Sequence, residues 1–540
     1  MEKLLQHNYK LVLALVSLAL LLPHLDGIYV NIMEARNFIT AREMAANDSW
    51  LLTTINGLPR YEKPPLPTWL TALAGLLFGF ENLYGLRLPV VLATVFLVLM
   101  AYAFSTQLGL PKKQAFHNGL LLITSFYIFF GGRDNQWDMY THSFMMGCLY
   151  FLWRLLEEDT GRFRNAVLSG LFFGLSFLSK GPISLYALFL PFLIAYGLAY
   201  GFRMKGRWGA AVLLLLLGTA VGLSWPLYVR YADPQSFMEV TAREASRWAS
   251  YNTRPPLYYW NFFTQSGIWA VPSLIALLYP YMKTRVADLK AYKLTLFWTL
   301  ASVVLLSLIP EKKARYLLPV LIPMALNTGF YVEYLFRRFR ELAKGEKRLA
   351  LFAFGLLGAI ACVLPFALFF VLKNPDGFWL WYGLVAAACL VCGILILRAL
   401  WQDNFGRAFY GIVAFQISVI AFGLPLAGAF WGNPDYYSPK GLRVLEEKEH
   451  IRIYDLQGYS PEMIWEYGKP VPMVLDNGKI RMPKESRFGL LANVDDGKQL
   501  QETFKGYTIE KRLTVDLNQV PKSEKGYKKR LCRDFYIVSR

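Results

Sequence analysis

Charged residues are scarce in this sequence. Asp, Glu, Lys and Arg make up 18% of its 540 residues, whereas soluble domains carry about 25%. Hydrophobic residues make up 55%, and apolar runs of span length recur from Leu11 to about Phe430. This combination excludes an ordinary soluble globular protein and predicts a polytopic, mainly α-helical membrane protein.

Cysteine and histidine are also few, with five residues of each. Cys389 and Cys392 form a C-x-x-C motif, but they fall inside a predicted span with no accompanying histidine, which disfavours a metal or redox role. A small-residue cleavage site is missing after the first apolar run, Leu11 to Leu22. That run therefore predicts an uncleaved first span and not a signal peptide.

The formal net charge of +19 does not indicate a nucleic-acid partner. Most Lys and Arg residues sit in short clusters between apolar runs, where such clusters set membrane topology and face anionic lipid head groups. We therefore expect no nucleic acid among the partners.

The apolar runs predict about thirteen transmembrane helices. Lys3 and Lys10 precede the first one and predict a cytoplasmic N-terminus. The stretch Leu66–Phe80 is short for a span and is expected to insert only partly, because nearly every basic cluster then falls on the cytoplasmic side. The predicted spans are 11–22, 87–106, 117–132, 139–155, 164–179, 183–201, 208–227, 263–282, 291–309, 315–335, 349–372, 377–398 and 408–430.

Two domains are expected. Residues 1–432 form the transmembrane domain, with a first outer loop at 26–86 and a long outer loop at 228–262. Residues 433–540 are polar and form a small soluble α/β domain, which the odd number of spans places outside the membrane.

Local patterns support this division. Alternating runs at 451–454 and 535–538 predict strands, and turn signals follow at Asn477-Gly478 and at 495–497. Within the first outer loop, 34–46 has helical spacing and both signs of charge, which predicts a helix lying on the membrane surface.

The most informative polar stretch is Asn56 to Trp69, which contains Glu62-Lys63-Pro64-Pro65. The prolines hold the chain extended before a helix starts at Leu66. Glu62 and Lys63 then lie at a helix entrance, where the partial positive charge favours an anion.

Other ionisable residues recur on the predicted outer side, against the topological bias of basic residues. An anionic ligand is the simplest explanation, and nonspecific binding to outer-leaflet phosphates is the alternative. Helix capping is an alternative for Asp138, and snorkelling is an alternative for Lys180. These outer segments are Arg133–Asp138, Lys180 before Gly181-Pro182, and Glu311–Tyr316.

Such a set suits transfer of a group away from a phosphate-bearing lipid. A carboxylate acts as general base on an acceptor hydroxyl, while cations stabilise the departing phosphate. A divalent ion held by a carboxylate could share that task. A transporter or flippase of lipid-linked saccharides also uses acids and bases within the membrane, and it stays the alternative.

Five sequence features in order resemble the ArnT-type branch of the GT-C glycosyltransferases, which are related to the protein O-mannosyltransferases. The resemblance covers about the first 330 residues. The features are Glu34-Ala35-Arg36 with 41–44, Asn56–Leu66, Arg133 with Asp138, the turn 179–182, and Lys313 with 316–319.

The resemblance implies an inverting sugar transferase of the bacterial inner membrane. Its donor would be a polyprenyl (undecaprenyl) phosphate sugar, used on the periplasmic side, where the C-terminal domain also lies. The implied acceptor is lipid A or another surface glycolipid, with a protein acceptor, as in the O-mannosyltransferases, as the alternative.

The resemblance also implies site roles. Glu34 and Asp138 are the catalytic candidates, and Glu62 is the candidate ligand for a divalent metal cation. The expected donor-phosphate residues are Arg60, Lys63, Arg133, Lys180, Lys313 and Tyr316.

Two departures from the family pattern bear on these roles. Met33 stands where the family has Asp, so the base is either Glu34 or Asp138. The segment 230–260 holds no histidine, which argues against a permanent zinc site and leaves a weaker divalent ion open.

Overall fold

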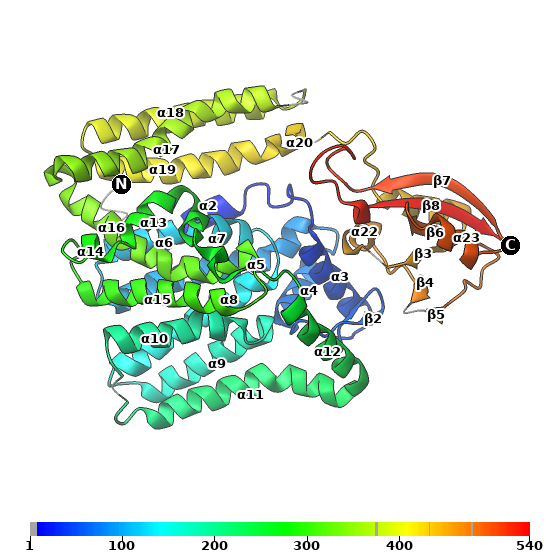
Figure 1. Cartoon of the computed structure of the whole chain (residues 1–540), viewed down its shortest axis with the longest axis horizontal. Helices are drawn as coiled ribbons and strands as arrows, with labels where there is room; N and C mark the ends of the chain where they lie inside the picture. Colours follow the sequence, from blue (N-terminus) through cyan, green and yellow to red (C-terminus); the bar gives the residue numbers. More distant parts are fainter. Residues whose placement is uncertain (1–7, 203, 373–375, 431, 459, 477–478) are drawn as a thin grey trace.

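The computed structural model describes residues 8–202, 204–372, 376–430, 432–458, 460–476 and 479–540. Long helices run side by side through most of the chain, and a β-sheet lies beyond one end of them (Figure 1). We call this end of the helices the outer end. The short helices α3 and α4 lie between the long helices and the sheet.

Helices and helical turns, written α and η, account for most of the first 430 residues. The first half contains α2 (Tyr9–Leu21), α3 (Ile32–Ala46), α4 (Leu66–Phe78), α5 (Leu83–Gln107), α6 (Lys112–Ile123), α7 (Phe126–Gly131), α8 (Trp137–Glu157), α9 (Arg162–Lys180), η1 (Leu185–Phe189), α10 (Leu190–Ala199) and α11 (Trp208–Ala232). The second half contains α12 (Pro234–Ser250), η2 (Pro256–Tyr259), η3 (Phe262–Trp269), α13 (Ala270–Ala276), α14 (Tyr279–Met282), α15 (Leu289–Leu308), η4 (Ala314–Val320), α16 (Leu321–Arg338), η5 (Phe339–Glu341), α17 (Lys344–Val371), α18 (Trp379–Trp401), α19 (Phe405–Ser418), η6 (Val419–Gly423), η7 (Leu424–Leu426) and α20 (Ala427–Phe430).

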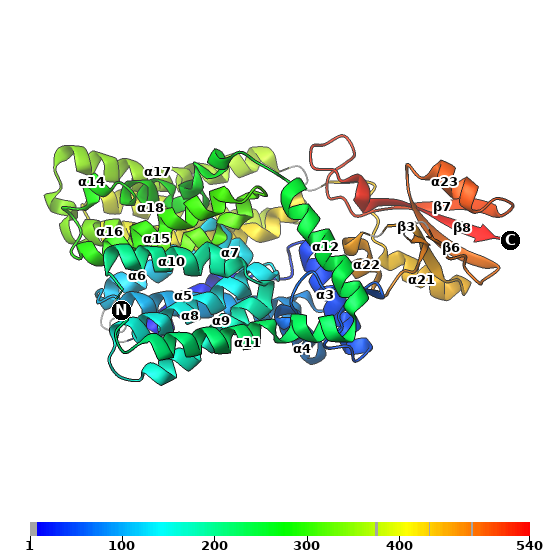
Figure 2. The same cartoon turned by 60° about the horizontal axis from the view of Figure 1, so that its bottom comes forward.

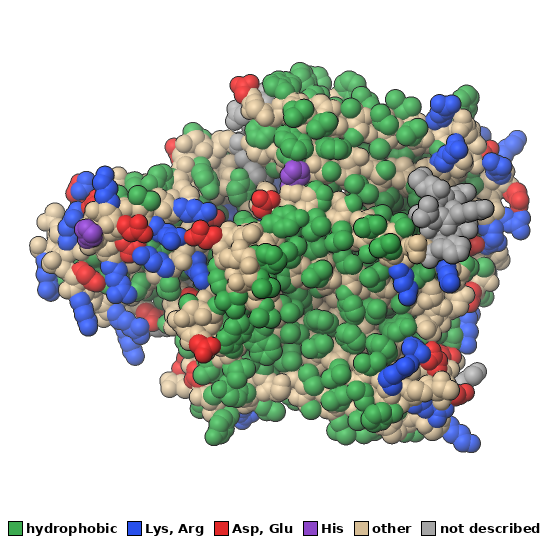
Figure 3. Space-filling model, turned by 180° about the vertical axis from the view of Figure 1, so that it is seen from behind, with side chains coloured by type: hydrophobic (Ala, Val, Ile, Leu, Met, Phe, Trp, Pro, Cys, Tyr) green, Lys and Arg blue, Asp and Glu red, His purple; other side chains and the backbone are tan. Residues whose placement is uncertain are grey.

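The prediction of a mainly helical membrane protein is confirmed. Within the described residues, six helices are long and apolar enough to cross a membrane: α5, α11, α15, α17, α18 and the segment Phe405–Phe430. The other predicted spans fall on helices that are shorter, interrupted or more polar. On one face of the helical part, hydrophobic side chains form a broad band and Lys and Arg lie towards its ends (Figure 3).

Helices α3 and α4 lie at the outer end, and local sequence signals fix where each begins. The Asn31 side chain caps α3 by accepting hydrogen bonds from the backbone N–H groups of Met33 and Glu34 at 2.9 and 3.3 Å. Helix α4 begins after Pro64-Pro65 and has 13 residues, about 20 Å of length. It is too short to cross a hydrocarbon core of about 30 Å.

The C-terminal part, residues 433–540, contains one six-stranded mixed sheet. Its strand order is β5-β4-β3-β6-β8-β7, with β3 parallel to β4 and β6 and the remaining pairs antiparallel. Its elements are α21 (Lys440–Glu449), β3 (Ile453–Gln457), α22 (Pro461–Tyr467), β4 (Met473–Asp476), β5 (Lys479–Ile480), β6 (Arg487–Asn493), α23 (Gly497–Thr503), β7 (Thr508–Asp516), η8 (Lys529–Leu531) and β8 (Cys532–Ser539).

Three local predictions can be placed on this sheet. The alternating runs 451–454 and 535–538 lie at the start of β3 and within β8. The turn signal at 495–497 directly precedes α23. The predicted turn at Asn477-Gly478 lies outside the described residues.

The C-terminal part packs against α3. Phe38 of α3 and Trp465 of α22 place their rings 5.0 Å apart, and Arg42 donates to the Ile464 carbonyl at 3.3 Å. Both aromatic side chains belong to one buried apolar cluster that joins α3 to the sheet. Helix α3 is therefore largely buried, because its apolar side chains pack against protein, and its position on the membrane surface stays a prediction.

Candidate functional site

A tight hairpin leads into the Glu62-Lys63 motif. Strands β1 (Thr54–Ile55) and β2 (Leu58–Pro59) pair around Asn56-Gly57, whose φ angles are +55° and +75°. This is the turn for which Asn-Gly is the preferred sequence. The Arg60 N–H closes the hairpin by donating to the Thr53 carbonyl at 2.9 Å. The hairpin therefore fixes where the motif begins.

Three consecutive motif residues contact the segment around α12. The Tyr61 hydroxyl donates to Asp233 Oδ2 at 2.8 Å, and Arg243 Nη2 donates to Glu62 Oε1 at 2.9 Å. Lys63 Nζ lies 3.9 Å from Glu244 Oε2. Figure 2 shows α12 crossing the outer end in front of α3. The long outer loop therefore covers the motif through complementary charges.

Asp138 and Lys180 form an ion pair between the start of α8 and the last residue of α9. The N-cap of α8 is Gln136 and Asp138 lies in the first turn, so its carboxylate serves the ion pair and not the cap position. The side chains of Lys180 and Asp138 are only 7% and 15% exposed. Neither capping nor snorkelling therefore describes this pair.

Lys63 joins this charge cluster. Burial, with the neighbouring positive charge of Lys180, lowers the pKa of the Lys63 ammonium below its ordinary value, against the opposing charges of Glu244 and Asp138. Arg60 also acts on Lys63 electrostatically. We call Arg60, Lys63, Asp138 and Lys180 the outer charge cluster.

Arg60 and Glu62 meet beside Trp137. The Arg60 guanidinium lies 4.9 Å from the centre of the Trp137 ring and donates to Thr40 Oγ1 at 3.0 Å. Trp137 Nε1 and Glu62 Oε2 are buried and have no hydrogen-bond partner among the described residues. Glu62 Oε2 lies 3.9 Å from Arg60 Nε, and buried polar atoms are normally paired, so the Trp137 indole N–H is the donor still available to a ligand.

The segment before α16 extends the cluster. Lys313 Nζ and the Tyr316 hydroxyl both donate to Glu311 Oε1, at 2.6 and 2.9 Å. Lys180 Nζ lies 5.9 Å from the centre of the Tyr316 ring, which connects this segment to the Asp138 pair.

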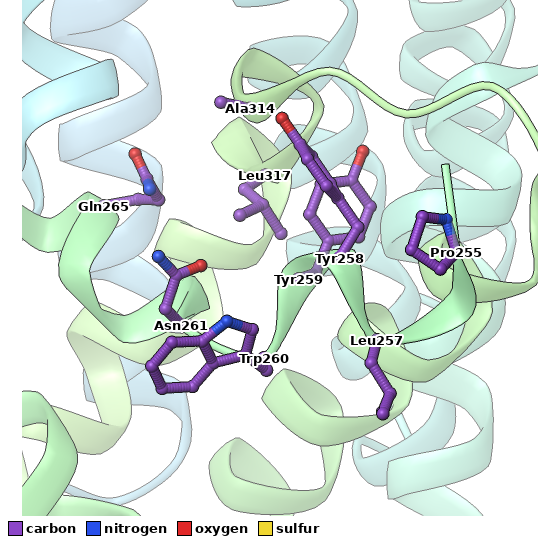
Figure 4. A pocket seen from close by; sticks show the side chains of 9 residues that line it. All are labelled: Pro255, Leu257, Tyr258, Tyr259, Trp260, Asn261, Gln265, Ala314 and Leu317. Carbon is purple, nitrogen blue, oxygen red and sulfur yellow. The ribbon is translucent and has the colours of Figure 1, made fainter. Parts of the chain in front are cut away.

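Next to Lys313 there is an open pocket of about 460 Å³ (Figure 4). The Tyr259 hydroxyl donates to the Lys313 carbonyl at 3.0 Å and accepts from its N–H at 3.2 Å. Trp260 and Leu257 are 73% and 80% exposed. The lining residues, mostly apolar or aromatic, are Pro255, Leu257, Tyr258, Tyr259, Trp260, Asn261, Gln265, Ala314 and Leu317.

Glu34 and Arg133 have other partners. Arg87 binds both Glu34 carboxylate oxygens at 2.7 Å, and both side chains are only 1% exposed. Arg133 donates to four backbone carbonyls at the end of α2, those of residues 20, 21, 23 and 24. Among the described residues, neither bonds to the outer charge cluster, so the structure does not bring these two predicted site residues into it.

Three further charged residues, to which the sequence assigned no site role, lie near the predicted site residues. Arg243 pairs with Glu62, and Arg315 donates to Gln136 Oε1 at 3.3 Å. Asp134 lies near Glu34, and burial together with that charge raises the pKa of Asp134 to about 7. A sequence signal existed only for Arg315 and Asp134, which flank predicted residues; Arg243 lies inside a long loop of mixed charge.

The residues around Glu62 do not fit a resident divalent cation. Its carboxylate faces two guanidinium groups, since Arg60 Nε lies 3.9 Å away and Arg243 donates to it. Across the ranges that the structure describes, no three His, Cys, Asp or Glu side chains gather as a metal site. Hard cations prefer several oxygen ligands, so no chemical step is assigned to a metal.

Comparisons with known proteins confirm the resemblance predicted from the sequence. A family profile described as dolichyl-phosphate-mannose-protein mannosyltransferase matches residues 62–225. The undecaprenyl phosphate-alpha-4-amino-4-deoxy-L-arabinose arabinosyl transferase of Pseudomonas savastanoi pv. phaseolicola is 28% identical over 85% of this chain and 86% of its own length. The protein of that name from Pseudomonas aeruginosa LESB58 is 29% identical over 80% of this chain and 78% of its own.

The fold has solved counterparts. The crystal structure of ArnT from Cupriavidus metallidurans bound to undecaprenyl phosphate matches with a TM-score of 0.66 at 17% identity, covering 99% of this chain and 97% of the other. Its apo form matches with a TM-score of 0.67. The fold is therefore that of the ArnT-type GT-C proteins.

The buried Glu34–Arg87 pair yields a stability prediction. Glu34→Gln leaves the Arg87 charge buried without its counter-ion, so the free energy of unfolding should fall by about 3–5 kcal/mol. Thermal unfolding in detergent measures this. The control is Glu341→Gln, which breaks the exposed pair with Arg338 and should cost at most about 1 kcal/mol. A Glu34→Gln protein with native stability but no turnover would instead support Glu34 as the base.

Proposed function

We propose that this chain, which resembles the ArnT-type GT-C glycosyltransferases in sequence and fold, transfers a sugar from undecaprenyl phosphate to lipid A or another surface glycolipid. The observation that carries the proposal is the outer charge cluster. Lys180 pairs with Asp138, and the charges of Lys180, Arg60 and Asp138 all act on Lys63 at the outer end, where the positive-inside bias alone would not place cations. The names of the relatives make aminoarabinose the first sugar to test.

The proposed reaction exchanges one bond for another. The bond between the sugar anomeric carbon and the phosphate oxygen breaks, and a bond from that carbon to the acceptor oxygen forms on the opposite face. The acceptor hydroxyl gives its proton to a carboxylate, and polyprenyl phosphate leaves with its electron pair. Lys63 and Arg60 hold the leaving phosphate, and this stabilisation of growing negative charge is worth several kcal/mol in such sites.

Among the two candidate bases, we favour Asp138. Its carboxylate lies beside Lys180 and within the field of Lys63, so it can accept a proton next to the bound phosphate. Glu34 is bound at both oxygens by Arg87 and accepts from the Asn135 N–H at 3.1 Å. We assign Glu34 the role of holding Arg87 and the loop before α8 in place.

The membrane arrangement is part of the proposal. About thirteen spans place the N-terminus in the cytoplasm and residues 433–540 in the periplasm, as an α/β domain following the transmembrane domain 1–432. The pocket beside the Lys313 backbone suits the first isoprenoid units of the donor, because its walls are mostly aromatic and apolar.

A transfer assay tests this function. Purified protein in lipid is incubated with labelled undecaprenyl-phosphate sugars and a membrane extract, and the acceptor that gains label is identified. Label in a glycolipid supports the proposal, and label in protein supports an O-mannosyltransferase-like activity. Movement of the sugar lipid between leaflets without transfer would support a transporter instead.

Asp138→Asn should lower kcat by about 10²–10⁴-fold, because the amide cannot take the acceptor proton. Asp138→Asn also removes the counter-ion of the nearly buried Lys180, so some loss of stability is expected, and kcat is compared per folded protein. The control is Asp288→Asn, at the start of α15, where the side chain accepts from the Ala291 N–H at 2.9 Å. Native turnover in Asp138→Asn with native expression would remove Asp138 as the base.

Lys63 gives the site a pH dependence. Its pKa is lowered, so Lys63 loses its charge at a lower pH than an ordinary lysine, whose pKa is about 10.4. Donor affinity is therefore present at low pH and should fall as pH rises through the Lys63 pKa. Donor KM measured from about pH 7 to 10 should rise in the native chain. In Lys63→Arg that rise should disappear or shift upward; an identical profile in both would contradict the assignment.

A further inference from the structure

The hairpin before the Glu62-Lys63 motif is held from two sides. On one side, Glu43 of α3 accepts hydrogen bonds from Thr54 Oγ1, Asn56 N–H and Gly57 N–H, at 2.7, 2.7 and 3.1 Å. Glu43 is 3% exposed, so three donors satisfy a buried carboxylate. This contact fixes the hairpin to the helix beneath it.

On the other side, the C-terminal part forms two hydrogen bonds with the same turn. Asn56 Nδ2 donates to the Val471 carbonyl at 2.8 Å, and the Val471 N–H donates to Asn56 Oδ1 at 2.7 Å. Both residues are buried, Asn56 at 8% and Val471 at 3% exposure. The Asn56 side-chain amide thus pairs with the Val471 backbone as two strand residues pair with each other, although the two residues are 415 positions apart.

Val471 is itself firmly placed. It follows α22 and precedes β4, and its side chain belongs to the apolar cluster that contains Phe38, Ile39 and Trp465. A displacement of Asn56 therefore has to work against the packing between the C-terminal part and α3. The hairpin in turn sets the start of the motif, because Arg60 bonds back to Thr53.

Resting on the proposed function, we infer that Asn56 is a positioning residue and that the C-terminal part, through Val471, holds Arg60 and Lys63 in register for the donor phosphate. Asn56 itself need not touch the donor. A shift of about 1 Å in such groups can cost a hundredfold in rate. The C-terminal part thus acts in donor binding, although it supplies none of the cations of the outer charge cluster.

Two substitutions test the hydrogen bonds between Asn56 and Val471 separately from the backbone conformation of the turn. Asn56→Gly keeps the positive φ of the turn and removes both bonds to Val471. Asn56→Asp keeps the acceptor for the Val471 N–H, removes the donor, and sets a buried carboxylate against the Val471 carbonyl and near Glu43. The matched control is Asn518→Gly, because Asn518 makes the same two-bond clasp with the Lys528 backbone, at 2.8 and 3.1 Å, within the C-terminal part.

The full-length protein in detergent is tested with undecaprenyl phosphate as the probe. We expect Asn56→Gly to weaken the thermal stabilisation by undecaprenyl phosphate and to raise the KM for the undecaprenyl-phosphate sugar by roughly tenfold or more, and Asn56→Asp to weaken both at least as much. Amide hydrogen exchange at 57–63 should quicken in Asn56→Gly, whereas Asn518→Gly should bind donor normally.

Three outcomes overturn the inference. Native donor KM in Asn56→Gly would show that the clasp does not position the site, even if the melting temperature falls. Equal loss of donor binding in Asn518→Gly would show general destabilisation. If the native chain neither binds undecaprenyl phosphate nor transfers sugar, the proposed function fails, and the role of Asn56 in it fails too. Amide hydrogen exchange at 57–63 still reports whether the two bonds between Asn56 and Val471 order the hairpin. If Asn56→Gly does not fold, Asn56→Asp carries the same comparison.

Discussion

Compensation of buried charge governs the outer end of this protein. A charged side chain near the membrane is costly unless it is paired or hydrogen-bonded. Glu34 is paired with Arg87, Asp138 with Lys180, and Arg133 is satisfied by four backbone carbonyls. These pairings separate ionisable residues that bond to protein atoms from those that can still bind a ligand.

The pairing of each charged side chain indicates whether it stabilises the fold or can bind a ligand. Both carboxylate oxygens of Glu34 accept from Arg87, and both terminal nitrogens of Arg133 donate to backbone carbonyls, although Arg133 Nε has no hydrogen-bond partner among the described residues. Among the described residues, the carboxylate partner of Lys63 lies 3.9 Å away, and the Trp137 indole N–H has no hydrogen-bond partner. A phosphate with its oxygens fits the second group, since it can accept from the lysine and the indole at once.

Local sequence signals predicted much of this arrangement. Apolar runs located the helices, the two prolines located the start of α4, and the break at Gly181-Pro182 located Lys180 at a helix end. Lys63, Asp138 and Lys180 were all placed on the outer side, and the structure brings their charges together.

What sequence could not supply were partners far apart in the chain. Arg87 lies 53 residues from Glu34, and the carbonyls that receive Arg133 lie more than 100 residues before it. Side-chain spacing carries no information about such pairs, so Glu34 and Arg133 looked as open as Lys63. The burial of α3 was missed for the same reason, because its cover comes from residues beyond 440.

The pairing of α12 with the motif has a consequence for affinity. Glu244 already faces Lys63 and Arg243 already faces Glu62, so an arriving phosphate substitutes for an internal anion instead of meeting a bare cation. Binding strength then reflects the difference between two electrostatic contacts. Glu244 is a built-in counter-ion for Lys63. It lowers the energetic cost of the Lys63 charge in the absence of donor, and it favours ligands that carry more negative charge than a carboxylate.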